Sequence, residues 1–268
     1  MTATGRSVLD LPIDDGWTFV ADWQKQVHDL REFAGIRELP LRLMLDTAAT
    51  EPILPEPLPG VKVSVERDPK PFRGTGGLLR DIADQYDDDA YLVVANAAQV
   101  LLQPLPELTW TMAATGGDIC AVSHLDGVPS GLMFVQCRCL RKIPEIGFVD
   151  LKEQALPMIS KNHRASVVYR EVPSGLPVRS LEGYIRALSC YHKSRVGKSF
   201  MDPFGEDWET SFSIVEPGAE VAEGARLHDS VVLRGGRVER DAFVAKSIVC
   251  GDGIVTRRKT VVDELIRA

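Results

Sequence analysis

The sequence predicts an α/β fold with a mostly parallel sheet, followed by a short left-handed parallel β-helix. Two observations predict the first part: strand-like and helical stretches alternate from residue 61 to residue 184, and a proline-rich connector, residues 51–60, precedes them. A third predicts the second part, since apolar β-forming residues recur about every six positions after residue 210. We therefore expect two domains, residues 1–200 and residues 201–268.

The elements of the first domain follow in chain order. A helix is expected at residues 19–33 and a strand at 41–45, before the connector. After it we expect a strand at 61–65, a helix at 77–85, strands at 91–95, 118–123 and 132–136, and a helix at 151–162. Cys137 and Cys139 then continue a strand, and their thiols would face one side as ordinary buried groups.

The second domain is predicted from a periodic series of apolar residues spaced by six or five positions. The series is Val215, Val221, Leu227, Leu233, Val238, Val244, Val249, Val255 and Val261. Small residues stand two positions before several of them, as the tight corners of a triangular coil require: Ala219, Ala225, Gly236, Ala242 and Gly253. The alternative is a β-meander, whose strands would alternate with period two. The six-residue period favours the β-helix, with about three coils.

Composition excludes several function classes. The chain has 268 residues, a net charge of -7 and 44% hydrophobic residues, which is ordinary for a globular protein. An acidic chain is a poor ligand for nucleic acid, and no apolar run approaches the roughly 20 residues that span a membrane. Residues 1–6 lack a secretory signal, so we expect a cytoplasmic protein. Five cysteines without a C-x-x-C pair predict neither a disulfide framework nor a zinc site.

Three segments carry a resemblance to a known family. They are residues 7–13 (SVLDLPI), residues 74–79 (GTGGLL) and residues 147–154 (GFVDLKEQ) followed by Pro157. Together with the α/β-plus-β-helix order, they resemble the sugar-nucleotide pyrophosphorylases, which include mannose-1-phosphate guanylyltransferases and glucose-1-phosphate adenylyl- and thymidylyltransferases. The resemblance implies a Rossmann-like nucleotidyltransferase domain. It also implies nucleotide contact at Gly74, Thr75, Gly76 and Asn96, where glycines let backbone amides approach a ligand. A tight strand-to-helix turn is the structural alternative for the glycines.

The same comparison predicts that the catalytic parts are missing. The family's glycine-rich triphosphate loop, and the strand before it, have no counterpart before residue 7, and its lysine falls near Val8. Its two magnesium-binding aspartates align with Ala98 and Pro177, which offer no carboxylate oxygen. We therefore expect no catalytic residue, no metal site and no cofactor. Asp150 and Glu153 have the spacing of a helix-capping box, which is a structural role.

We expect a catalytically degenerate relative that acts as a regulatory, scaffolding or sugar-nucleotide-sensing protein. Its partners would be a second copy of the chain, bound through the β-helix, and an active homologous enzyme or another protein. One alternative is an active nucleotidyltransferase that holds Mg²⁺ with other carboxylates, such as Asp46, Asp118 or Glu182. Another is an acyltransferase with His228 as its base, which would need a trimer.

Overall fold

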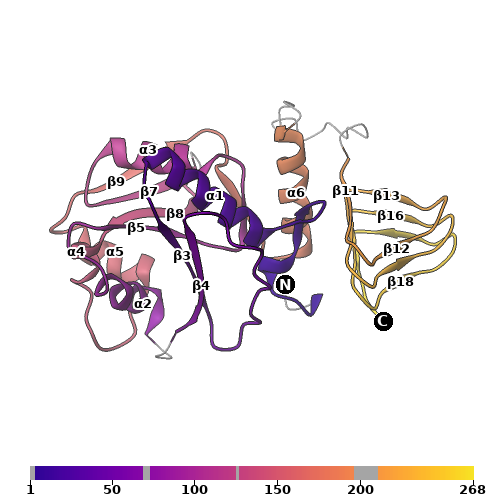
Figure 1. Cartoon of the computed structure of the whole chain (residues 1–268), viewed down its shortest axis with the longest axis horizontal. Coiled ribbons are helices and arrows are strands. Elements are labelled where there is room, and N and C mark those ends of the chain that lie inside the picture. The colour runs from indigo at the N-terminus through magenta and orange to yellow at the C-terminus, as the bar shows by residue number, and fades with distance from the viewer. Residues whose placement is uncertain (1–3, 69–72, 125–126, 196–210) are drawn as a thin grey trace.

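The computed structural model describes residues 4–68, 73–124, 127–195 and 211–268. Figure 1 shows an α/β part, then helix α6 (Leu181–Arg195), then a stack of short strands that ends at the C-terminus. Within the described part of the chain, no helix is long and apolar enough to cross a membrane. The connector at residues 51–60 contains no helix or strand, as its four prolines predict.

The largest sheet of the α/β part has the strand order β5-β8-β7-β9. Its strands are β5 (Tyr91–Ala95), β7 (Ile119–His124), β8 (Pro129–Gln136) and β9 (Ala165–Arg170). β7 and β9 are parallel, whereas β8 runs antiparallel to both β5 and β7. The short connection from β7 to β8 explains this reversal, because parallel neighbours need a long crossover. The sheet is therefore mixed rather than mostly parallel.

A second, separate sheet pairs β3 (Leu39–Leu45) with β4 (Val61–Arg67) in parallel. Helix α1 (Phe19–Ala34) contacts both strands, and the Trp23 indole N–H donates to the carbonyl of Ala97, just after β5. Two small antiparallel pairs complete the part: β1 (Pro12–Asp14) with β2 (Trp17–Thr18), and β6 (Gln99–Leu101) with β10 (Gly175–Pro177). Helix α1 thus holds the two larger sheets in one layered unit.

The helices depart from the sequence prediction at several places. Cys137 and Cys139 lie on the short helix α4 (Cys137–Leu140), not on a strand, although both thiols are buried as expected. The helix expected at 151–162 is a π-helical turn, η3 (Leu151–Ala155), followed by α5 (Leu156–Ile159). Helix α3 (Leu105–Thr115) and helix α6 were not predicted. Helix α2 (Gly74–Ala83) begins three residues earlier than expected. A short 3₁₀ turn, η2 (Val8–Asp10), precedes β1.

The C-terminal residues 212–268, here called the repeat region, form three parallel sheets. Their orders are β11-β14-β17-β20, β12-β15-β18 and β13-β16-β19. Every pairing joins residues 17 positions apart, for example Ser213 with Ser230 and Arg226 with Phe243. The strands are β11 (Ser213–Val215), β12 (Glu220–Val221), β13 (Arg226–His228), β14 (Ser230–Val232), β15 (Arg237–Val238), β16 (Phe243–Ala245), β17 (Ile248–Val249), β18 (Ile254–Val255), β19 (Thr260–Val262) and β20 (Leu265–Ile266). The chain therefore passes through the three sheets in turn every 17 residues.

Left-handed backbone conformations recur with the same period. Gly224, Asp241 and Arg258 have φ of 83°, 62° and 60°. A second series, Asp229, Lys246 and Asp263, has φ of 45°, 47° and 56°. A positive φ is uncommon outside glycine, so its return every 17 residues marks fixed corners between the sheets.

The period also corrects one residue of the sequence-based series. Val232, not Leu233, pairs with Val215 and Val249, and Val232 and Val249 belong to the interior cluster of the repeat region. Leu233 points outward, into the core that the repeat region shares with the α/β part. The true spacing is six, six and five, which sums to 17.

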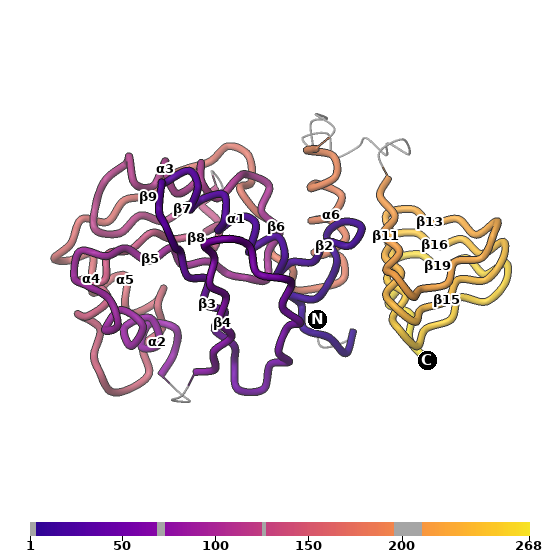
Figure 2. The backbone as a smooth tube through the Cα atoms, viewed as in Figure 1, coloured from indigo at the N-terminus to yellow at the C-terminus, as the bar shows by residue number. Residues whose placement is uncertain are grey.

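One apolar core joins the two parts. Ile214, Val231 and Ile248, on the outer side of the first sheet of the repeat region, belong to the same buried cluster as Leu11 and Tyr184. Polar contacts reinforce this junction: both carboxylate oxygens of Glu216 accept hydrogen bonds from Arg6, at 2.8 and 2.9 Å. Figure 2 shows the tube of α6 beside β11 at this junction.

Candidate functional site

Two of the three recognised segments dock against each other. The backbone N–H of Gly76, near the start of α2, donates to the carbonyl of Val149 at 3.0 Å, and the N–H of Val149 donates to the carbonyl of Arg73 at 2.9 Å. A Cβ on Gly74 would lie 2.5 Å from the Val149 oxygen, and a Cβ on Gly76 would lie 2.8 Å from it. Gly74 also has a φ of +70°. Close approach of residue 149 therefore accounts for both glycines.

The other two predicted nucleotide-contacting residues are exposed. Thr75 lies in the first turn of α2, and Asn96 follows the end of β5. The Asn96 side-chain oxygen accepts a hydrogen bond from the N–H of Ala98 at 3.1 Å, and its backbone N–H donates to Gly131 at 2.9 Å. Among the described residues, no hydrogen bond links Asn96 to the start of α2. Thr75 and Asn96 thus lie at the ends of two adjoining elements, since α2 and β5 share a buried cluster.

Ala98 and Pro177 come together in the structure, although 79 positions separate them in the sequence. β6 and β10 pair so that Pro177 lies opposite Gln99, and the N–H of Val178 donates to the Ala98 carbonyl at 2.8 Å. Ala98 is half-buried and Pro177 is exposed. Two aspartates that hold one metal ion must stand at neighbouring positions, and residues 98 and 177 are neighbours. The side chains of Ala98 and Pro177, however, carry no oxygen that could bind a metal.

Gln99 is a residue at this location that sequence reasoning missed. It is 3% exposed, and its side chain lies against Gly131 and Gly175, where added Cβ atoms would approach it within 4.0 and 3.0 Å. Its amide nitrogen has no hydrogen-bond partner among the described residues. No motif in the sequence includes Gln99, so the sequence gives no signal that this side chain is buried at the place where β6 and β10 pair.

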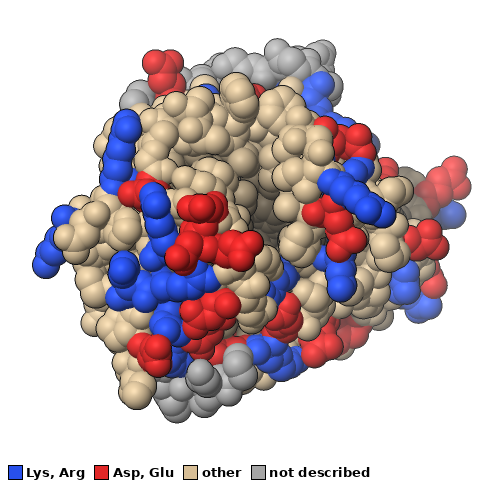
Figure 3. All heavy atoms as spheres, turned by 60° about the vertical axis from the view of Figure 1, so that its left-hand side comes forward, with Lys and Arg blue, Asp and Glu red and all other residues tan. Residues whose placement is uncertain are grey.

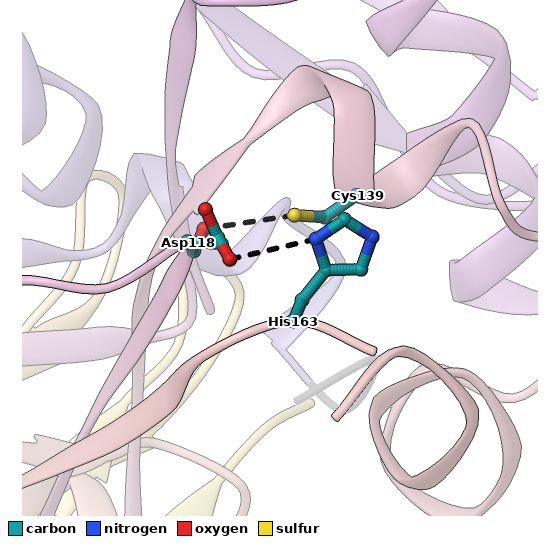
Figure 4. Close-up of side chains that lie close together, drawn as sticks. All are labelled: Asp118, Cys139 and His163. Atoms are coloured by element: carbon teal, nitrogen blue, oxygen red, sulfur yellow. Dashed lines mark hydrogen bonds and ion pairs between the residues drawn. The ribbon is translucent and has the colours of Figure 1, made fainter. Parts of the chain in front are cut away.

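One cluster of potential metal ligands exists among the described residues, and it lies elsewhere (Figure 4). It comprises Asp118, Cys139 and His163, whose ligand atoms lie within 4.8 Å of one another. Burial raises the pKa of the Cys139 thiol to about 11, so the thiol is neutral near pH 7. Its sulfur lies 4.0 Å from the backbone carbonyl of Asp118.

The Asp118 carboxylate in this cluster is already engaged. It accepts hydrogen bonds from the Arg138 guanidinium at 2.5 Å and from the Arg164 backbone N–H at 2.9 Å, and it lies 3.4 Å from His163 Nδ1. The bond from Arg138 lowers the pKa of Asp118. A metal ion would have to displace a cation and deprotonate a thiol of raised pKa. The cluster therefore joins the starts of β7 and β9 to α4, and it is not a ready metal site.

The remaining alternatives from the sequence do not form a site together. Asp46 and Glu182 are exposed, and neither belongs to the Asp118 cluster. His228 is half-buried at the end of β13, where its Nε2 lies 3.7 Å from the carboxylate of the adjacent Asp229. These positions give no support to a second carboxylate site for Mg²⁺.

A hollow of about 330 Å³ lies between β3, β4 and α2. Its polar border includes an ion pair in which two nitrogens of the Arg42 guanidinium, Nε and Nη2, donate to the two carboxylate oxygens of Glu66, at 2.9 and 2.6 Å. Figure 3 shows Lys and Arg side chains interspersed with Asp and Glu on the face that it presents. Mixed charges of this kind produce no extended basic surface, in agreement with the net charge of -7.

Comparisons with known proteins agree with this architecture at the level of fold. No protein-family model matches the sequence, and no curated protein matches it. HddC from Yersinia pseudotuberculosis, solved in complex with GMP-PN, is similar over 67% of this chain and 88% of its own, with 14% identity and a TM-score of 0.50. A second HddC structure has 14% identity and a TM-score of 0.46, and the match covers 68% of this chain and 93% of HddC. Rv0371C from Mycobacterium tuberculosis H37Rv, solved in complex with manganese, has 19% identity and a TM-score of 0.44, and the match covers 69% of this chain and 94% of Rv0371C. The chain therefore shares its fold with HddC.

Proposed function

We propose that this protein is a nucleotidyltransferase-like protein that binds a sugar nucleotide without catalysing a reaction on it. Through association with a protein partner, it would regulate that partner according to whether the sugar nucleotide is bound. One observation carries the proposal: Ala98 and Pro177 adjoin where two metal-binding aspartates would be expected, and neither can hold Mg²⁺. Nucleotidyl transfer places charge on phosphate oxygens, and without a bound cation much of that charge has no stabilising partner.

The nucleotide would contact the surface between the start of α2 and the end of β5. Thr75 and Asn96 are the exposed polar groups there, and HddC supports a guanosine nucleotide as the first probe, since it was solved with GMP-PN. Gly74 and Gly76 would act indirectly, by letting residue 149 pack against α2. We also interpret the repeat region as the left-handed parallel β-helix that the six-residue period predicts, and assign it to protein association.

Calorimetric titration tests the proposal. GMP, GDP-mannose and other sugar nucleotides are titrated with and without Mg²⁺, beside a pyrophosphate-release assay on the same preparation. We expect binding that does not depend on Mg²⁺, and no release of pyrophosphate. Turnover with any sugar 1-phosphate would show an active enzyme, and the absence of any binding would rule out nucleotide sensing.

A matched pair of variants locates the nucleotide. Thr75→Glu places a negative charge at the exposed start of α2 and should weaken phosphate-bearing ligands at least about tenfold. Thr115→Glu introduces the same change at an exposed position at the end of α3, and should bind as the parent does. Equal affinities for both variants would place the nucleotide elsewhere.

A further inference from the structure

Two strands of the α/β part each leave one edge unpaired. Among the described residues, β3 pairs with β4 alone and β5 pairs with β8 alone. Helix α1 contacts β3, and the indole of its Trp23 donates to the Ala97 carbonyl, just beyond β5. The hydroxyl of Tyr86, in the segment that leads into β5, accepts a hydrogen bond from Arg42 of β3 at 3.5 Å. The two free edges therefore lie near each other, and we call the strip between them the seam.

The hydrogen-bond pattern identifies the free backbone groups of the seam. On β3, the Leu39 N–H and the Leu45 carbonyl bond to the β4 side. On β5, the Asn96 N–H and the Ala90 carbonyl bond to the β8 side. Alternate residues of a strand bond to the same side, so the residues between these turn their N–H groups to the seam. Four such amides, here called the seam amides, make no hydrogen bond within the described part of the chain: Arg42, Met44, Val93 and Ala95.

The exposure of β5 indicates an open edge rather than an open face. Val93 and Ala95 pack against the buried cluster that contains α1, whereas Leu92 and Val94 pack against the cluster that contains α2. All four side chains are only half-buried, although helices cover both faces. In contrast, β7 pairs on both sides and is mostly buried. Water therefore reaches β5 along the seam.

An occupant of the seam must be an extended, apolar segment of polypeptide. A backbone in strand conformation offers N–H and C=O groups to two edges at once. Because α1 and α2 cover the two faces, its side chains must be apolar on both sides, as in other strands buried on both faces. The hollow of about 330 Å³ gives room for such side chains on the α2 side, where Met44, Leu78 and Ile82 border it. Arg42 needs no counter-charge from the occupant, since it is paired with Glu66.

We propose that the seam binds one extended apolar segment of a different protein, which pairs with β3 on one side and with β5 on the other. In the described part of this chain, the apolar strands are already paired within their own sheets, so a second copy offers no free strand. Pairing at both edges would join the two larger sheets of the α/β part into one. The inference gives the chemistry of the partner in the proposed function, but it rests on neither nucleotide binding nor the repeat region.

A synthetic peptide tests this inference on the full chain, without nucleotide. The probe has five alternating valine and isoleucine residues, the length of β5, between pairs of lysines that keep it soluble. Nuclear magnetic resonance follows the exchange of single amides. The seam amides should exchange rapidly in the free protein, and at least about tenfold more slowly at millimolar peptide. The amides of Leu43 and Val94, which bond to β4 and β8, should be slow throughout.

Two N-methylated peptides separate an inserted strand from a strand that adds to a single edge. Methyl groups on alternate amides block one edge of the first peptide, and the second peptide carries them on its other edge. A strand between β3 and β5 uses both of its edges, so each methylated peptide should bind at least about tenfold more weakly than the probe of the same charge. A strand that adds to one edge would tolerate one of the two modifications.

A matched pair of variants locates the peptide. Met44→Glu places a carboxylate in the seam and should weaken the probe at least about tenfold, although the new charge attracts its lysines. Lys62→Glu, at an exposed position on the neighbouring strand β4, also adds negative charge and should not weaken binding.

Four results would overturn the proposal. They are slow exchange of the seam amides in the free protein, no binding at millimolar probe, full affinity of either methylated peptide, and full affinity of a folded Met44→Glu variant. None of them bears on the nucleotide titration, so failure of this inference and failure of the proposed function are distinguishable.

Discussion

At the scale of single residues, Ala98 and Pro177 allow a direct test of the missing metal site. The backbones around them are joined by the hydrogen bond from Val178 to Ala98. The double variant Ala98→Asp/Pro177→Asp should therefore gain Mg²⁺ affinity, because two carboxylates at adjoining positions form the ordinary oxygen site for this ion.

The measurement is a thermal shift with millimolar Mg²⁺. We expect the melting temperature of the double variant to rise with Mg²⁺, while each single variant and the parent respond little. Equal responses in all four proteins would show that the two positions do not form one site.

Asp22, on the first turn of α1, makes stability depend on pH. Burial raises its pKa from 3.8 to about 6, against the opposing hydrogen bond from Trp17. The folded state thus holds the proton more tightly than the unfolded state, so this group's contribution to stability is full below pH 4 and is lost as pH rises to about 6. Asp22→Asn should then raise the free energy of unfolding above pH 6 by about 1 to 2 kcal/mol.

Urea denaturation at pH 4.5 and pH 7.5 checks this expectation. The difference between Asp22→Asn and the parent should grow with pH, whereas Asp15→Asn, at an exposed position, should give a constant difference. If the difference in the free energy of unfolding between Asp22→Asn and the parent did not change with pH, the pKa of Asp22 would not be raised in the folded protein.

At the scale of elements, the contact between α2 and residue 149 determines which glycine is required. Gly76→Ala gains about 1 kcal/mol of helix propensity, but its Cβ would lie 2.8 Å from the Val149 oxygen, an overlap that costs more than this gain. We expect a net loss of about 1 to 3 kcal/mol in the free energy of unfolding.

Thr75→Ala is the control for this change, because Thr75 lies beside Gly76 in the same helix and is exposed. It should change the stability by less than about 0.5 kcal/mol in the same urea titration. A stabilised Gly76→Ala would show that residue 149 does not pack tightly against α2.

The π-helical turn explains a detail that sequence spacing could not resolve. The Asp150 side chain caps the turn as predicted, accepting from the N–H groups of Lys152 and Glu153 at 2.8 Å. In the reciprocal bond, the Asp150 N–H donates to the side-chain oxygen of Gln154, not to Glu153. The wider π turn places the residue four positions on, rather than three, over the cap.

At the scale of the whole molecule, the shared core predicts that the two parts unfold together. Ile248 is fully buried in the cluster that also contains residues of the α/β part. Ile248→Ala should therefore destabilise both parts, by about 2 to 4 kcal/mol. Val262→Ala, at a position 46% exposed in the same repeat region, should have little effect.

Two probes follow this unfolding. Three of the four tryptophans, Trp17, Trp23 and Trp110, belong to the α/β part, so tryptophan fluorescence follows mainly that part, and far-ultraviolet circular dichroism includes the strands of the repeat region. Coincident urea transitions, shifted together by Ile248→Ala, are the expected result. Two separate transitions would show that the parts are independent domains, divided near residue 200.

Local patterns in the sequence determined most elements of this protein. The apolar spacing from Phe19 predicted helix α1 to within one residue, the apolar run at 91–95 predicted β5, and the six-residue period predicted parallel strands after residue 210. These properties depend on neighbours along the chain, so composition and periodicity are enough. The sequence also shows directly that residues 98 and 177 carry no carboxylate, because they are alanine and proline.

The tertiary structure alone decided which other residues the predicted elements contact. Strand pairing brings Ala98 beside Pro177, close packing of Val149 explains Gly76, and the 17-residue register turns Leu233 outward and Val232 inward. It also exposes Val221 while burying Val238, two valines with the same place in the repeat. Contacts between distant segments set burial and register, and no local pattern contains them.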